Sequence, residues 1–212
     1  GLFDATVKGC GTTAYESWAV RAYGAASALT IADNTLSDYT RDGIVVSEAL
    51  ATVSGNTLAG SAIPLNGISL QDVTAGVVTN NTVAGHTRSA PWAACGIIVW
   101  DSTGVLVTGN QVSGNFYGVC LEGADSGKVI RNTLTGNIKR GFSLNDADNN
   151  VVTANTISGP LNGSDDTAIG LANGSTGNLI GGATLAEGNI ITLATSGTGN
   201  LYAVYVQGDV GA

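Results

Sequence analysis

Apolar and polar residues alternate along this chain in short segments. In the segment 96–101, Ile97 and Val99 alternate with more polar or outward-facing neighbours, which is the period-two pattern of a half-buried strand. The segments 106–108 and 111–113 follow after short turns, and each offers one inward aliphatic residue. No stretch shows apolar residues spaced three and four apart, so the pattern predicts three short strands per unit and excludes a helical repeat.

An asparagine, usually followed by a threonine and an aliphatic residue, recurs seven times. The copies begin at Asn34, Asn56, Asn81, Asn110, Asn132, Asn155 and Asn189. The first six are 22, 25, 29, 22 and 23 residues apart, and a small residue followed by an apolar one repeats with the same period, from Gly43-Ile44 to Ala203-Val204. Periods of this length are typical of solenoids, in which each coil buries its apolar face only by stacking on its neighbours.

The repeated asparagine lies at a bend between strands, three residues after an inward aliphatic residue and two before the next. Stacked asparagines at such a bend can hydrogen-bond to one another and to the backbone, which would satisfy their buried amides. We therefore expect a structural ladder of asparagine side chains along the solenoid.

The coils resemble the parallel β-helix repeats of the pectate-lyase-like superfamily, from about Phe3 to Gln207. The resemblance implies an all-β, right-handed parallel β-helix with three short strands per coil and about seven to eight coils of 22–25 residues, forming one domain over residues 1–212. That superfamily includes polysaccharide lyases, hydrolases and epimerases alongside tailspikes and adhesins. The resemblance consequently implies the fold and leaves the activity open.

The amino-acid composition limits the classes of binding partner that this chain can have. The net charge is −8 with only eight Lys and Arg, which argues against nucleic acid, since phosphate binding needs a basic stripe. No apolar run approaches the roughly 18 residues of a membrane span, so we expect no membrane insertion. The abundance of Asn, Thr, Gly and Ser favours an extracellular or cell-surface protein.

The three cysteines, Cys10, Cys95 and Cys120, show no metal-ligand spacing. Cys95 and Cys120 belong to adjacent coils but are offset by three positions, which is about 10 Å along a strand. That exceeds the disulfide limit of about 7 Å between Cα atoms. We therefore expect all three to be unpaired thiols.

One sheet face gathers residues suited to a glycan. Its predicted outward side chains mix aromatic, amide and hydroxyl groups, and long connections precede it after Val83 and after Ile157. The candidate substrate-binding residues are Trp100, Gln71, Asn145 and Tyr205 on the strands, with His86, Arg88 and Trp92 in the first long connection. An ordinary solvent face and tolerated surface loops would produce the same pattern.

An acidic column, Glu48, Asp72, Asp101 and Asp146, runs one position further along the same strands. Carboxylates on adjacent coils would lie about 5 Å apart and repel by about 1 kcal/mol in water. Hydrogen bonds within turns are the expected explanation. A weaker alternative is a bound cation such as calcium, which would need six to eight oxygen ligands that we cannot assemble here. We expect no other cofactor.

An enzymatic interpretation is also open. A lyase or epimerase acting on an acidic glycan needs an acid–base group and cations for the substrate carboxylates. Glu122 or Asp101 could act as the acid–base group. Lys139 and Arg140 could supply the cations that bind the substrate carboxylates. The pair Asp165-Asp166 resembles the paired aspartates of polygalacturonases, although the other positions of that family's pattern are missing.

Neither end resembles the cap that usually shields a β-helix, so we expect either a segment of a longer β-helix or subunits that stack head to tail. The sequence as a whole favours a non-catalytic extracellular module with a structural or adhesive role. Its expected partners are polysaccharide, bound on one sheet face, or copies of itself. The alternative is a polysaccharide lyase or epimerase acting on an acidic glycan.

Overall fold

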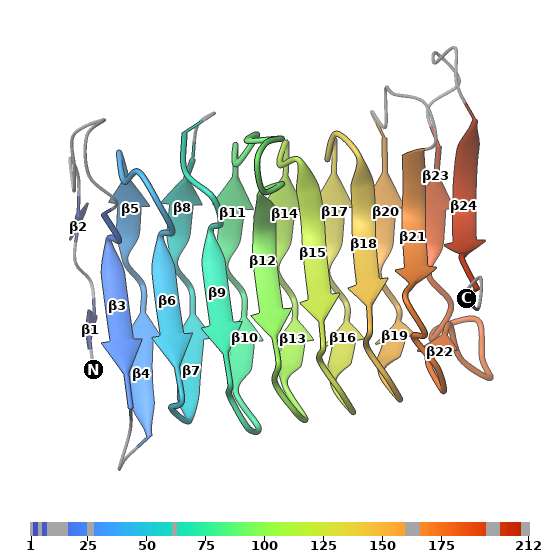
Figure 1. The fold of residues 1–212 in the computed structure, drawn as a ribbon, viewed down its shortest axis with the longest axis horizontal. Helices are drawn as coiled ribbons and strands as arrows, with labels where there is room; N and C mark the ends of the chain where they lie inside the picture. The colour runs from blue at the N-terminus through green and yellow to red at the C-terminus, as the bar shows by residue number, and fades with distance from the viewer. Residues whose placement is uncertain are drawn as a thin grey trace.

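The computed structural model describes residues 2–3, 6–7, 17–24, 28–60, 63–159, 166–193 and 200–208. Within these ranges the regular structure consists of parallel β-strands that wind into a solenoid, with the strands of successive coils side by side (Figure 1). The sequence-predicted features at Cys10 and at 160–165 lie outside the described residues. The predicted all-β parallel β-helix is confirmed.

Each coil contributes one strand to each of three parallel sheets. The first sheet contains β1 (Leu2–Phe3), β4 (Leu29–Ala32), β7 (Ala51–Ser54), β10 (Val77–Thr79), β13 (Leu106–Thr108), β16 (Lys128–Ile130), β19 (Val151–Thr153) and β22 (Leu179–Ile180). The second contains β2 (Thr6–Val7), β5 (Thr35–Ser37), β8 (Thr57–Ala59), β11 (Thr82–Ala84), β14 (Gln111–Ser113), β17 (Thr133–Thr135), β20 (Thr156–Ser158) and β23 (Ile190–Thr192).

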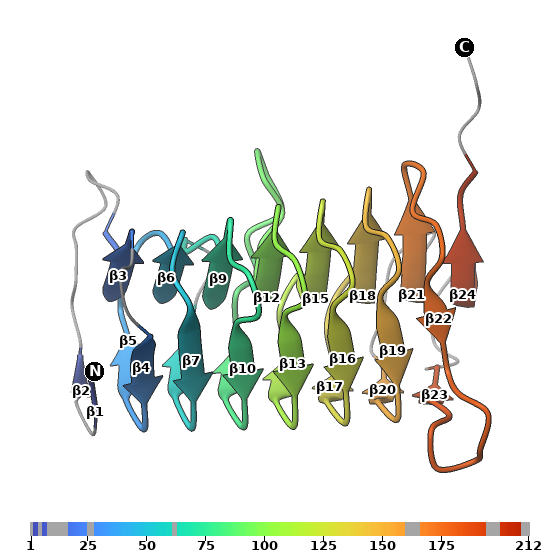
Figure 2. The same ribbon diagram turned by 90° about the horizontal axis from the view of Figure 1, so that it is seen from below.

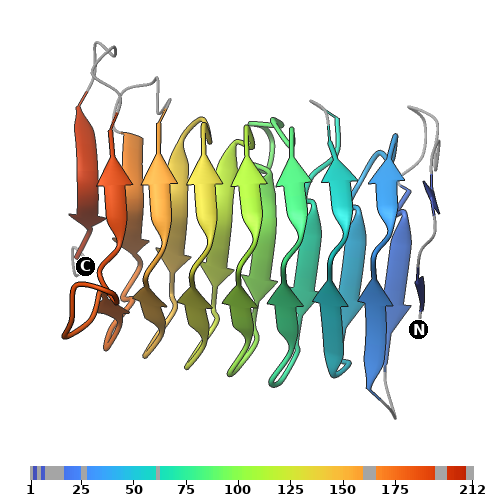
Figure 3. The same ribbon diagram turned by 180° about the vertical axis from the view of Figure 1, so that it is seen from behind.

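The third sheet has the longest strands and carries the candidate site. It contains β3 (Val20–Tyr23), β6 (Ile44–Ser47), β9 (Ile68–Gln71), β12 (Cys95–Trp100), β15 (Tyr117–Glu122), β18 (Arg140–Asn145), β21 (Asp166–Ala172) and β24 (Leu201–Val206). The views from below and from behind show this sheet on one side of the solenoid and the shorter strands of the other two opposite it (Figures 2 and 3).

Strand register stacks equivalent residues of successive coils. Ile97 pairs with Ile68 on one side and with Val119 on the other, and all three are fully buried in the core. The shorter strands repeat this arrangement, as where Val107 lies between Val78 and Val129. The apolar interior is thus one continuous column, which agrees with the stacked coils that the repeat in the sequence predicted.

The asparagine ladder is present as expected. Asn110 donates from Nδ2 to Oδ1 of Asn132 at 2.9 Å and to the carbonyl oxygens of Val78 and Thr108, at 3.0 and 3.1 Å. Its own Oδ1 accepts from the backbone and side-chain amides of Asn81, at 2.9 and 3.0 Å. Each buried amide group is therefore satisfied by its neighbours in the stack.

Candidate functional site

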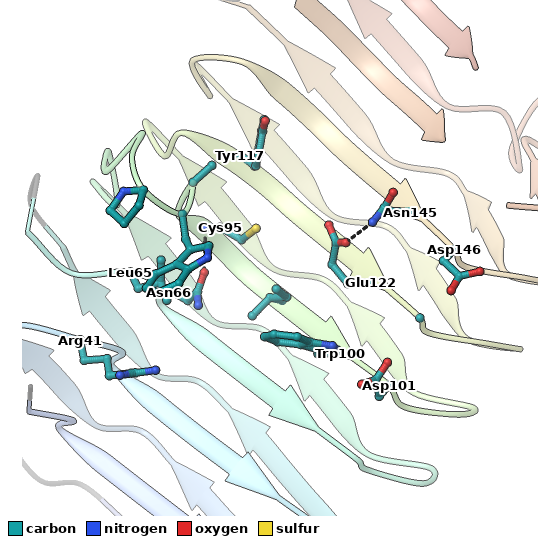
Figure 4. Close-up of a pocket in the computed structure, with 15 residues that line it drawn as sticks. Arg41, Leu65, Asn66, Cys95, Trp100, Asp101, Tyr117, Glu122, Asn145 and Asp146 are labelled. Carbon is teal, nitrogen blue, oxygen red and sulfur yellow. Dashed lines mark hydrogen bonds between the residues drawn. The ribbon is translucent and has the colours of Figure 1, made fainter. Parts of the chain in front are cut away.

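A groove of about 700 Å³ lies on the outward face of the third sheet. Its floor is formed by β12, β15 and β18, and one wall is formed by Leu65, Asn66 and residues 91–93 (Figure 4). The opposite edge follows the turns that end these strands, at Asp101, Gly123 and Asp146.

Trp100 stands on this floor between two polar neighbours. The register pairs it with Gln71 on β9 and with Glu122 on β15, the arrangement expected from the repeat. Half of the Trp100 side chain remains exposed. Gln71 is turned along its own strand, because its amide donates to Ser69 Oγ at 3.0 Å, and it does not line the groove. An indole with an open surface is therefore held beside the carboxyl group of Glu122.

Glu122 and Asn145 point toward one another across the floor (Figure 4). Asn145 Nδ2 donates to Glu122 Oε2 at 2.6 Å, and Asn173 donates in turn to Asn145 Oδ1. Burial raises the pKa of the Glu122 carboxyl above its usual range, while the bond from Asn145 and the positive charge of Arg140 oppose this rise. The pair offers a carboxyl and an amide in fixed positions for hydrogen bonds to a ligand.

The two candidate cations of the enzymatic interpretation have different surroundings. Lys139 Nζ lies 2.9 Å from Oδ1 of the fully buried Asp166, so it forms an ion pair with this carboxylate and does not line the groove. Arg140 donates to Ser143 Oγ at 3.0 Å, and its guanidinium lies 5.7 Å from the ring centre of Tyr117. Of the two, only Arg140 shares a face with Glu122.

His86 is not a surface residue, so the sequence-based assignment of this histidine to a binding loop is wrong. Its side chain is fully buried, with Nδ1 at 3.0 Å from Asn115 Oδ1 and Nε2 at 2.7 Å from the Tyr39 hydroxyl. His86 follows Asn81 by five residues, as Asn115 follows Asn110 and Asn137 follows Asn132, and Asn115 donates to Asn137 Oδ1 at 3.2 Å. This offset was the signal that would have placed His86 in a second interior ladder.

The other predicted binding residues are dispersed. Trp92 is 67% exposed on the groove wall. Arg88 bonds to the carbonyl of Ala90 at 3.2 Å within the same connection and does not line the groove. Tyr205 lies on β24, three strands from β15, which corresponds to about 14 Å, and it packs against Tyr202 with 5.1 Å between ring centres.

Cys95 and Cys120 form a disulfide, so the expectation that these cysteines are unpaired is wrong. The predicted three-position offset is real, because Cys120 pairs with Ile98 and not with Cys95. The Cα atoms are nevertheless 6.2 Å apart, which means that the chain bends between Cys95 and Ile98 and does not run straight. Both cysteines are buried against Ile98 with Tyr117 beside them, and the bond links β12 to β15 in the floor of the groove.

The acidic column occupies a left-handed turn position. Its members have φ of 54° at Glu48 and Asp72, 45° at Asp101 and 49° at Asp146. Gly123 and Asn173 occupy the same place with φ of 60° and 50°. Asp, Asn and Gly tolerate this conformation best, which accounts for most of the column. Among the described residues, no three His, Cys, Asp or Glu side chains group as a metal site would require.

The family described as "right handed beta helix region" matches residues 18–185 of this chain. No curated protein matches the sequence. In the part of the chain that the structure describes, no helix has the length and apolarity to cross a membrane.

Solved structures that are similar to this chain include the following two. The first, the periplasmic alginate epimerase AlgG, has a TM-score of 0.57 and 18% identity over 82% of this chain and 43% of that one. The second, the DFA-IIIase of Arthrobacter chlorophenolicus A6 in complex with GF2, has a TM-score of 0.49 and 17% identity over 84% of this chain and 45% of that one. This chain thus spans less than half the length of either protein, and at these identities the likeness concerns the fold alone.

Proposed function

This chain belongs to the right-handed β-helix family, and we propose that it is a non-catalytic extracellular module that binds polysaccharide in the groove of the third sheet. The observation that carries the proposal is the half-exposed Trp100 beside the hydrogen-bonded pair Glu122–Asn145 within this groove. Aromatic faces provide large rigid contact surfaces, and a few fixed polar groups then orient the ligand. Trp92, exposed on the wall, adds a second such surface.

The proposed extracellular location is supported by the Cys95–Cys120 disulfide, since disulfides persist mainly in oxidising compartments. The alginate epimerase that has a similar fold is periplasmic, which agrees with this proposal. Because the bond links the two floor strands β12 and β15, an oxidising environment would also help to hold the floor of the groove in place.

The enzymatic alternative, a lyase or epimerase acting on an acidic glycan, is less well supported. Of its four candidate residues, Lys139 is engaged by Asp166, and Asp101 occupies a turn position that favours such a residue for conformational reasons. Glu122 and Arg140 remain on one face. Incubation with uronate polymers, followed by ultraviolet absorbance for lyase products and by NMR for epimerised residues, tests this alternative. Activity lost in Glu122→Gln would establish it over a purely binding role.

Affinity electrophoresis through gels containing soluble polysaccharides tests the binding proposal. We expect at least one polysaccharide to retard the protein, and Trp100→Ala to weaken the affinity by about tenfold or more, as loss of a central aromatic contact usually does. Leu185→Ala is the matched control, because this exposed side chain lies between β22 and β23, away from the third sheet. Equal retardation of both variants would refute the groove as the binding site.

Head-to-tail association of copies remains a second proposal, and one observation favours it. Val204 and Val206 continue the inward columns of Ile169 and Leu171, yet they are 45% and 66% exposed on the last strand. A further coil stacked on β24 would bury these side chains, and a second copy or a continuation of the same chain could equally supply it. A sedimentation coefficient that rises with protein concentration would support this association, provided that Val206→Lys abolishes the rise. A protein that stays monomeric at all concentrations would refute it.

A further inference from the structure

The groove carries more negative than positive charge. Three carboxyl groups line it, those of Asp101, Glu122 and Asp146, against the single guanidinium of Arg41. Arg41 itself has an acidic neighbour, because its Nε lies 3.5 Å from Asp42 Oδ2. Its guanidinium also stacks over Trp18, at 5.4 Å from the ring centre.

Apart from Arg41, the lysine and arginine residues discussed above add no positive charge to the lining of the groove. Lys139 is paired with Asp166, and Arg88 bonds within its own connection. Arg140 acts on Glu122 electrostatically, but it is directed to Ser143 and does not line the groove. The net charge of −8 for the whole chain has the same sign as the groove.

A glycan with a carboxylate or sulfate on each sugar would bring repeated negative charge to this surface. Like charges in a cleft repel a ligand, and such repulsion is a common source of specificity. An uncharged glycan meets no such opposition, since it can stack on Trp100 and Trp92 and donate hydroxyl hydrogen bonds to the carboxyl oxygens.

Resting on the proposed function, we infer that the groove selects uncharged polysaccharides and rejects polyanionic ones. The ligand class is therefore a neutral glycan rich in hydroxyl groups, in contrast to the acidic glycan of the enzymatic alternative. The carboxyl groups at the groove edge and floor are the selecting residues, and the indoles supply the contact surface.

The test measures affinity for three classes of polymer of matched length. The neutral class contains a β-glucan, a galactomannan and an inulin-type fructan; the anionic class contains alginate, polygalacturonate and chondroitin sulfate; chitosan is the cationic polymer. We expect a neutral polymer to bind with an affinity that depends little on salt. The affinity for the anionic class should be lower by a factor of about ten or more. A triple variant, Asp101→Asn with Glu122→Gln and Asp146→Asn, should reduce that discrimination at low salt.

A matched control removes the same number of charges elsewhere, by Asp33→Asn, Asp38→Asn and Glu187→Gln. These residues do not line the groove, so this control should keep the preference of the original chain. If both triple variants lose discrimination equally, net charge and not the groove is responsible, and the inference fails.

The outcomes also separate the inference from the proposed function. Tightest binding of an anionic polymer or of chitosan, weakened by Trp100→Ala, would overturn the neutral-glycan inference and retain glycan binding in the groove. Binding of no polymer in any class would overturn the proposed function itself, and the inference with it.

Discussion

The hydroxyl of Tyr39 donates a hydrogen bond to Nε2 of His86, 2.7 Å away and 47 residues further along the chain. The direction of this bond follows from the other ring nitrogen, because Asn115 Oδ1 can only accept and His86 Nδ1 therefore carries the proton. Between the two residues passes Gly60, where a Cβ atom would collide with the imidazole ring. One small residue thus lets a tyrosine reach across an intervening coil.

We predict that this buried histidine makes stability depend on pH. Burial lowers the pKa of His86 to about 4 from the 6.5 expected in the unfolded chain. The unfolded state therefore binds more protons between these values, so the contribution is fully present above pH 6.5 and is lost as pH falls toward 4. The expected loss is about 3 kcal/mol in the free energy of unfolding. Urea denaturation at a series of pH values between 7 and 4 measures it.

The matched control is His86→Gln, which cannot titrate in this range. It should be less stable than the original chain at pH 7, and the difference between the two proteins should shrink as the pH is lowered. A constant difference across the range would show that His86 does not control the acid response.

Removal of the Tyr39 hydroxyl should lower the free energy of unfolding measurably. Tyr39→Phe leaves His86 Nε2 buried without a donor, and an unsatisfied buried acceptor costs about 1–3 kcal/mol. Tyr23→Phe removes a hydroxyl that bonds to Glu48 at 3.0 Å on a side chain that is 66% exposed. The change at Tyr23 should stay within about 0.5 kcal/mol. Denaturant midpoints of the two variants compare the sites, and equal midpoints would contradict the interior network.

Interruption of the asparagine ladder should be costly. Asn110→Ala removes three donated bonds and leaves the backbone amide of Asn81 without its acceptor, although Asn81 Nδ2 keeps the carbonyl oxygens of Val53 and Thr79, so we expect a loss of about 3 kcal/mol. Gln111→Ala alters the adjacent, exposed side chain and should change stability by about 0.5 kcal/mol at most. Thermal melting of both variants measures the difference. A small effect at Asn110 would mean that water can replace the ladder.

The disulfide can be detected directly in the denatured protein. Without reductant, one thiol of the three cysteines should react with an alkylating reagent, and after reduction all three should react. Chymotryptic digestion, which cuts after Trp100 and Tyr117, should yield a linked pair of peptides that contain Cys95 and Cys120. Cys10→Ser should keep this linkage and lose the free thiol; a linkage that includes Cys10 would contradict the structure.

The repeat in the sequence determined the architecture because solenoid coils interact locally. Each asparagine and each inward aliphatic residue contacts its counterpart about 22–35 residues away, so the recurring phrase is enough to predict the strands, the ladder and the neighbours of Trp100. Glu122 could be placed beside Trp100 for the same reason, and Asn145 one strand further along.

The tertiary structure decided what departs from a regular coil. The bend after Cys95 shortens a separation that a straight strand would make too long for a disulfide, and the sequence period contains no information about such a bend. The burial of His86 depends on a bond to Tyr39 across an intervening coil, and the engagement of Lys139 depends on the buried carboxylate of Asp166. Side-chain direction and burial arise from packing between coils, and for this reason spacing predicted which residues are neighbours but not which of them face the groove.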